Sequence, residues 1–181
     1  MIKIALTGPE STGKTELCIR LAEHFQAVYE PELAREYVEK LGYTYTYEDV
    51  CTIARLQTEQ EKQYATGVEA KPVFFDTDVI ITKVWLEYKY GQVPAFVTEH
   101  ISGRLMDFYL LCEPDLPWVS DPVREHGDDR EFFFDWYERE INRLGTSCVK
   151  INGTGEMRFL NALKAVEDFL ATKGNRFLSE K

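Results

Sequence analysis

The chain has 181 residues, which is long enough for one ordinary domain and short for two. Hydrophobic residues make up 44% and charged residues 29%, and these globular proportions exclude a largely disordered chain. The formal net charge of −10 repels phosphate backbones, so we expect no nucleic-acid partner.

Strand and helix patterns alternate along the chain. The predicted strands cover residues 2–7, 27–29, 72–76, 107–112 and 147–151. The predicted helices cover residues 14–25, 33–41, 46–65, 78–90, 131–144 and 155–171. This alternation predicts an α/β fold with a mainly parallel sheet, in which ligands bind at the carboxyl ends of the strands. We expect one domain over residues 1–171 and a loose polar tail over 172–181.

Residues 8–15 follow the first predicted strand and fit the pattern G-x-x-x-x-G-K-[ST]. The backbone N–H groups of such a loop, together with the positive end of the next helix, form a cradle for phosphates. Lys14 would reach the β- and γ-phosphates of ATP, and the Thr15 hydroxyl would bind Mg²⁺. The predicted ATP-binding residues are Gly8, Pro9, Glu10, Ser11, Thr12, Gly13, Lys14 and Thr15.

Two aspartates follow the predicted strand 72–76. Asp76 ends this strand, where the carboxylate of an ATP-binding protein reaches the magnesium ion. Asp78 lies at the start of the next predicted helix. Because Asp-Thr-Asp also suits the N-cap of a helix, a purely structural role is the alternative for both residues.

A third acid, Glu32, lies near Glu30 in the loop after the second predicted strand. A kinase for a small alcohol needs a carboxylate that orients the hydroxyl and takes its proton. Arg35 follows one helical turn later, so a surface ion pair is the alternative for both side chains. The residues alone leave the two interpretations open.

Other side chains are candidates for the acceptor pocket. Gln57 falls on the inward face of its predicted helix, where its amide would either cap a neighbouring loop or meet a heterocycle. Trp85 would either pack in the core or form a wall for a flat ring. The candidates for a second wall are Tyr88, Tyr109 and Trp118.

The turn-rich stretch 114–130 follows the fourth predicted strand and carries Arg124 and Arg130. A lid that closes over ATP would bring such arginines to the transferring phosphoryl group. Ion pairs with the aspartates of the same loop are the alternative. Gly153 follows the last predicted strand, where the chain would either pass beside the adenine or form an ordinary turn.

Six segments, in the same order, resemble the ribosylnicotinamide kinase domain of the NadR family. They are GPESTGKTEL, PELAREY, IARLQ, FFDTDVIITKVW, YLLCEPDLPWVSDPVRE and NGTGEMRF. The resemblance implies a three-layer P-loop fold of the nucleoside and nucleotide kinase type, with a lid. It also implies transfer of the γ-phosphate of ATP, with Mg²⁺, to the 5′-hydroxyl of nicotinamide riboside. The product would be nicotinamide mononucleotide, in NAD salvage.

The resemblance also implies roles for particular residues. Glu32 and Arg35 would lie in the substrate loop, and Asp76 and Asp78 would serve magnesium and ribose. Trp85 would lie on the nicotinamide wall. Arg124 and Arg130 would lie in the lid. Asp76 and Glu32 both remain candidates for the base that orients the hydroxyl.

Larger members of that family carry a DNA-binding module and an adenylyltransferase ahead of this domain, whereas this sequence opens on the first kinase strand. We therefore expect neither transcriptional repression nor NAD synthesis. Two rival functions stay open: a kinase for another nucleoside, and a nucleotide-binding regulatory module without acceptor chemistry.

Apolar runs and cysteine spacing indicate where in the cell we expect the protein. No apolar run approaches 18 residues, and Gly8 and Pro9 interrupt the first apolar segment at once, so we expect no membrane partner and no signal peptide. The four cysteines are far apart in the sequence, which is typical of reduced thiols in a cytoplasmic protein.

Overall fold

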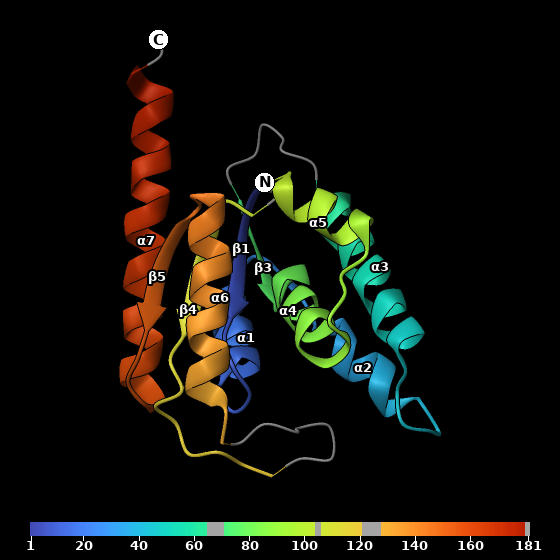
Figure 1. Ribbon diagram of the computed structural model, residues 1–181. Helices are drawn as coiled ribbons and strands as arrows, with labels where there is room; N and C mark the ends of the chain where they lie inside the picture. Colours follow the sequence, from blue (N-terminus) through green and yellow to red (C-terminus); the bar gives the residue numbers. More distant parts are fainter. Residues whose placement is uncertain (65–70, 104–105, 121–127, 180–181) are drawn as a thin grey trace.

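The computed structural model describes residues 1–64, 71–103, 106–120 and 128–179, the last six by their backbone alone. Strands and helices alternate as predicted (Figure 1). In chain order they are β1 (Ile2–Thr7), α1 (Lys14–Phe25), β2 (Val28–Glu30), α2 (Leu33–Glu39), α3 (Tyr47–Gln63), β3 (Pro72–Asp76), α4 (Val79–Tyr90), α5 (Ala95–Ser102), β4 (Phe108–Cys112), α6 (Arg130–Leu144), β5 (Ser147–Ile151) and α7 (Gly155–Ser179).

The described strands form one parallel sheet in the order β2-β3-β1-β4-β5. β1 lies at its centre, with Ile4 opposite Phe74 of β3 and opposite Phe108 of β4. All six residues of β1 are buried, as expected for a strand that is covered on both faces. The predicted parallel α/β fold is confirmed, and the carboxyl end of β1 opens at the middle of the sheet edge.

Helices cover both faces of the sheet. On one face, α1 and α7 pack against alternate strand residues such as Leu6 and Leu110. On the other face, α4 and α6 pack against Ala5 and Leu111. A third apolar cluster joins α3, α4 and α5, away from the sheet. The result is a three-layer molecule with α3 and α5 at the side opposite α7 (Figure 1).

Two boundaries differ from the sequence-based prediction. The helix α5 was not predicted, because only Val97 and His100 of its eight residues are buried and its apolar pattern is therefore short. The helix α7 continues past the expected end at Ala171 to Ser179. Just beyond that end, Lys173 bonds through Nζ to Asp107 Oδ1 at 3.1 Å, which ties the extension to the start of β4.

Candidate active site

The loop between β1 and α1 needs glycine at two positions. Gly8 has φ 148°, and a Cβ atom there would lie 2.6 Å from the carbonyl oxygen of Cys112. Gly13 is the N-cap residue of α1, with φ 72°. A side chain at either position would strain the backbone. The predicted strand–loop–helix context of the phosphate loop is therefore present.

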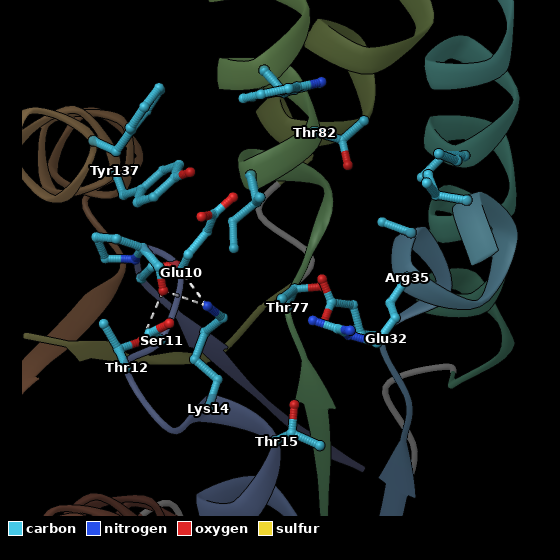
Figure 2. A pocket seen from close by; sticks show the side chains of 18 of the residues that line it. Glu10, Ser11, Thr12, Lys14, Thr15, Glu32, Arg35, Thr77, Thr82 and Tyr137 are labelled. Carbon is cyan, nitrogen blue, oxygen red and sulfur yellow. Dashed lines mark hydrogen bonds and ion pairs between the residues drawn. The ribbon is translucent and has the colours of Figure 1, made fainter. Parts of the chain in front are cut away.

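Lys14 folds back over this loop. Its Nζ atom donates to the carbonyl oxygens of Gly8 at 2.8 Å and Pro9 at 2.7 Å, and the hydroxyl of Thr12 donates to Pro9 at 2.9 Å (Figure 2). These bonds hold the ammonium at the mouth of the loop, where the β- and γ-phosphates of a nucleotide would lie.

Asp76, the last residue of β3, lies beneath this loop. It is 2% exposed, and neither of its carboxylate oxygens has a hydrogen-bond partner among the described residues. Burial raises the pKa of Asp76, while the Thr15 hydroxyl and the charges of Lys14 and Arg35 act against that rise. A buried acid without partners beside a hydroxyl fits Mg²⁺, which typically takes one or two protein ligands plus phosphate oxygens.

The described residues contain no cluster of three or more His, Cys, Asp or Glu side chains that could hold a metal ion by themselves. Mg²⁺ is usually bound through one or two protein ligands together with the phosphates of its nucleotide. Asp76 and Thr15 are the two residues that would hold it.

A cavity of about 400 Å³ extends from the phosphate loop between α2, α3, α4 and α6. Figure 2 shows the labelled side chains on its walls, with Lys14 and Thr15 toward one end and Thr82 toward the other. Its lining residues are Gly8, Pro9, Glu10, Ser11, Thr12, Gly13, Lys14, Thr15, Glu16, Glu32, Ala34, Arg35, Val38, Tyr45, Val50, Ile53, Thr77, Ile81, Thr82, Trp85, Phe133 and Tyr137. This volume suits a small organic ligand.

Aromatic rings enclose the end of the cavity that is remote from the phosphate loop. Trp85 lies 6.2 Å from Tyr45 and 6.4 Å from Phe133, measured between ring centroids. Tyr88 stacks against Trp85 at 6.2 Å but does not line the cavity. Trp85 therefore lines the cavity together with Tyr45 and Phe133, whereas none of the three candidates for a second wall contributes to the lining.

Glu32 and Arg35 both line the middle of the cavity, next to Thr77 (Figure 2). Their closest charged atoms, Oε2 and Nε, are 3.7 Å apart. Glu30, the other acid of this loop, instead accepts hydrogen bonds from Gln60 Nε2 at 2.7 Å and from the hydroxyl of Tyr64. Glu30 therefore serves the structure, and Glu32 is the acid of this loop that faces the cavity.

Asp78 points into the protein, away from the cavity. Its carboxylate accepts from the Thr7 hydroxyl at 3.3 Å and from the Tyr109 hydroxyl at 2.9 Å. Between the two aspartates, Thr77 has a left-handed backbone with φ 73° and donates its N–H to Leu6. Because of this turn, the side chains of Asp76 and Asp78 point to different sides of the sheet edge. Asp78 is also the N-cap residue of α4, the position that the structural alternative assigned to it.

Three other predicted residues also lie outside the cavity. Gln57 is buried, and its Oε1 accepts from the hydroxyl of Thr82 at 2.5 Å, one layer behind the wall. Trp118 is 39% exposed and does not contribute to the lining. Gly153 donates its N–H to Asp115 Oδ2 at 2.6 Å, in the loops beside the phosphate cradle.

The segment after β4 lies over the phosphate loop. The N–H of Val119 donates to Ser11 Oγ at 3.1 Å, and Leu116 reaches within 3.2 Å of where a Cβ of Gly13 would lie. Arg130 Nη1 donates to the carbonyl oxygen of Leu116 at 2.8 Å, so Arg130 holds this segment and does not line the cavity. Arg124 lies outside the described residues, and its role in a lid stays a prediction.

Sequence reasoning missed the contribution of α6. Phe133 and Tyr137 are one helical turn apart and both line the cavity. Residues four apart lie on the same face of a helix, and a tyrosine ring carries a polar hydroxyl. These two properties could have identified Phe133 and Tyr137 as residues that line a cavity. Tyr45 was missed because it lies in the loop before α3, where no periodicity applies.

Asp78 provides a test in the pH dependence of stability. Burial, and then the charge of Glu61, raise its pKa to about 8, although the Tyr109 and Thr7 hydroxyls oppose the rise. The folded protein then binds a proton that the unfolded chain releases near the ordinary carboxyl pKa of 3.8. The contribution of protonated Asp78 to the free energy of unfolding is therefore greatest at low pH, and it is lost as the pH rises toward 8.

We therefore expect the Tm of the wild type to fall between pH 5 and pH 8 by more than that of Asp78→Asn. A difference of about 3 °C would correspond to roughly 1 kcal/mol in a chain of this size. Thermal melts of both proteins across this range provide the measurement. Parallel pH curves would contradict the burial of a protonated Asp78.

Together, the central parallel sheet, the glycine-dependent loop after β1 and the buried Asp76 at the end of β3 define a P-loop nucleotide-binding protein with the fold of the P-loop kinases. The chain belongs to the AAA domain family, whose model matches residues 3–158. None of the helices in the described part of the chain has the length and apolar character that a membrane span requires.

Known proteins of similar sequence and structure agree with this class. The chain is 29% identical over 178 residues to the trifunctional NAD biosynthesis/regulator protein NadR of Salmonella typhimurium LT2; the match covers 94% of the chain and 43% of that relative. A crystal structure of NadR in complex with NR matches with a TM-score of 0.74 and 24% identity, covering 94% of this chain and 52% of that one.

A shikimate kinase from Acinetobacter baumannii, solved with shikimate, matches with a TM-score of 0.56 and 17% identity, covering 96% of this chain and 95% of that one. At these identities the solved structures show the fold. The chain spans less than half the length of the NadR relative.

Proposed function

We propose that this protein transfers the γ-phosphate of ATP to the 5′-hydroxyl of nicotinamide riboside, in NAD metabolism. One observation carries the proposal: a single cavity joins the phosphate cradle to an aromatic pocket, with a carboxylate between them. Such a cavity suits a nucleoside whose flat ring lies at the aromatic end and whose sugar hydroxyl points toward ATP. The similarity to NadR, whose structure was solved with NR, supports this choice of acceptor.

Within this proposal, Glu32 orients the acceptor hydroxyl and takes its proton. Glu32 faces the cavity, whereas Asp76 is buried beneath the phosphate loop beside Lys14 and Thr15. Because Glu32 lies where an acceptor would bind, we assign it as the base, and we assign Asp76 to magnesium. A bound magnesium ion would neutralise charge on the phosphates. Lys14 and Arg35 provide positive charge for the transferring phosphoryl group from the two sides of the cavity.

The test is an assay of ADP release, with mass spectrometry of the product, across nicotinamide riboside, thymidine and deoxycytidine. We expect turnover with nicotinamide riboside and a product heavier by one phosphoryl group. Turnover with a pyrimidine nucleoside alone would assign the protein to another nucleoside. ATP binding without transfer to any acceptor would favour a regulatory module.

Trp85 provides a second test of the acceptor pocket. Stacking of a base on an aromatic side chain contributes about 1–3 kcal/mol, so Trp85→Ala should raise the KM for the nucleoside by about tenfold. The KM for ATP should stay nearly unchanged, because Trp85 lies at the end remote from the phosphate loop. Steady-state kinetics with each substrate varied in turn provide the measurement.

Trp136→Ala is the matched control for this variant. Trp136 packs on Phe132 at 5.5 Å and does not line the cavity, so its truncation should affect stability without a selective effect on the nucleoside. Equal rises of both KM values in Trp85→Ala would indicate that Trp85 only packs in the core.

A further inference from the structure

A buried hydroxyl lies at the end of the cavity that is remote from the phosphate loop. Thr82 of α4 lines the cavity although it is only 4% exposed. Figure 2 shows its side-chain oxygen directed from α4 toward the middle of the cavity. Apolar side chains of α3 and α4, namely Val50, Ile53 and Ile81, line the cavity as well. A ligand that fills this end therefore meets a polar oxygen as well as apolar surface.

The hydrogen of this hydroxyl is already engaged. Thr82 Oγ1 donates to Oε1 of Gln57 on α3 at 2.5 Å. A hydroxyl group has one hydrogen to donate and two lone pairs that can accept. In the described part of the chain, no group donates to Thr82 Oγ1. Toward the cavity, the hydroxyl of Thr82 can therefore accept a hydrogen bond, whereas its own hydrogen is turned away.

Burial keeps this arrangement in place. Gln57 is 3% exposed, so its Oε1 has little access to water. If the hydrogen of Thr82 turned toward a ligand, a buried oxygen would lose its donor, and an unsatisfied buried acceptor is costly. Gln57 does not line the cavity, so a ligand meets it only through Thr82.

The hydroxyl lies within reach of a flat ligand in the aromatic end of the cavity. Thr82 and Trp85 are three residues apart in α4, which places them on the same side of the helix, and both line the cavity. Lys89 lies near the same rings, with Nζ 2.8 Å from the hydroxyl oxygen of Tyr45. Because this ammonium acts on any ring through its charge, the role of Thr82 is best tested with ligands of equal charge.

We propose that Thr82 is a specificity residue, which makes the cavity prefer a flat ring that carries an N–H donor over a ring of the same shape without one. A carboxamide or an exocyclic amine supplies such a donor. Gln57 is the positioning residue that fixes the direction of the bond. The inference deepens the proposed function and rests on it in that the ligand is taken to be a nucleoside.

The first experiment measures binding without phosphoryl transfer. Nicotinamide riboside and 3-acetylpyridine riboside are titrated by calorimetry in the absence of ATP. The two cations have the same charge and nearly the same shape, but a methyl group in the second replaces the amide NH₂ of the first. We expect the wild type to bind the amide about fivefold more tightly, as for one neutral hydrogen bond. Thr82→Val should bind both equally, and Thr82→Ser should retain the preference.

Two further variants test the bond between the helices. Gln57→Leu releases the hydrogen of Thr82, which can then donate to the carbonyl oxygen of either riboside, so the preference for the amide should shrink. The double variant Thr82→Val/Gln57→Leu removes both partners of the bond and leaves no buried oxygen unsatisfied, which favours a folded protein. It should lack the preference, like Thr82→Val.

Thr58→Val is the matched control. Thr58 of α3 is also buried, donates to the carbonyl oxygen of Arg55 at 2.8 Å and does not line the cavity. Its loss of a buried hydroxyl should leave the preference for the amide unchanged. Equal affinity of the wild type for the two ribosides, or binding of neither, would overturn the inference. A preference that persists in Thr82→Val or in the double variant would also overturn it.

The second experiment separates this inference from the proposed function. The kcat/KM values for the two ribosides are compared in the wild type and in Thr82→Val. We expect a ratio of about fivefold in the wild type and near one in the variant, with the difference in KM, because the 5′-hydroxyl is the same in both ribosides. Absence of phosphorylation of both ribosides, with the amide preference intact in the calorimetric titration, would overturn the kinase assignment and support the role of Thr82.

Discussion

Replacement of Lys14 by alanine is expected to lower turnover by about 10²–10³-fold, the usual effect of removing one preorganised donor to a developing charge. The ammonium now lies 2.8 Å and 2.7 Å from two carbonyl oxygens of the phosphate loop, close to where the β- and γ-phosphates would bind. The fold should survive, because the lost contacts are made to carbonyl oxygens at the mouth of the loop and lie outside the apolar core. Steady-state kinetics and a thermal melt of the same preparation provide the measurement.

Lys164→Ala is the control for this variant. Lys164 is exposed on α7 and pairs, among the described residues, with Asp168 one turn away at 2.7 Å, so its loss should change neither turnover nor Tm measurably. Full activity of Lys14→Ala would contradict the assignment of residues 8–15 as the triphosphate site.

Replacement of Asp76 by asparagine should separate stability from function. The buried carboxylate has no hydrogen-bond partner among the described residues, and burial raises its pKa more than Thr15, Lys14 and Arg35 lower it, so the charge destabilises the folded protein without ligands. The neutral amide removes this penalty, and the Tm of the protein without nucleotide should be unchanged or higher. Activity with Mg·ATP should nevertheless fall by two or more orders of magnitude, because a ligand of the magnesium ion is lost.

Thermal melts with and without Mg·ATP test this second prediction. A ligand at 100 times its Kd stabilises a protein by about 2.7 kcal/mol, which is roughly 5–10 °C in a chain of this size. The wild type should show such a shift and Asp76→Asn should not. Asp78→Asn, two residues away but directed into the protein, should keep the shift. A full ligand-induced shift in Asp76→Asn would exclude Asp76 from the metal site.

The phosphate end of the site could be predicted from the sequence because its chemistry depends on the backbone. The pattern over residues 8–15 specifies glycines where the chain approaches Cys112 closely and where α1 begins. The central strand was equally clear, since β1 is a short, mostly apolar run that ends at Gly8 and Pro9. Local sequence thus determines both the strand and the loop that follows it.

The rest of the cavity could not be predicted in the same way, because it is assembled from α2, α3, α4, α6 and the loop before α3. Trp85 was found through its aromatic character, whereas Phe133 and Tyr137 gave a pattern that core packing explains equally well. The directions of Asp76 and Asp78 depend on one backbone angle at Thr77, which sequence periodicity does not reveal. Such angles are set by tertiary contacts, here the bond from Thr77 to Leu6.

The left-handed turn at Thr77 places two neighbouring acids among different groups. The main influences on the pKa of Asp76 are burial, Thr15, Lys14 and Arg35, while those on Asp78 are burial, Glu61 and hydroxyl donors, so neither acid appears among the main influences on the other. A substitution at either acid therefore acts on a different neighbourhood: Asp76 lies beside the phosphate loop, and Asp78 joins α4 to β1 and β4 through Thr7 and Tyr109.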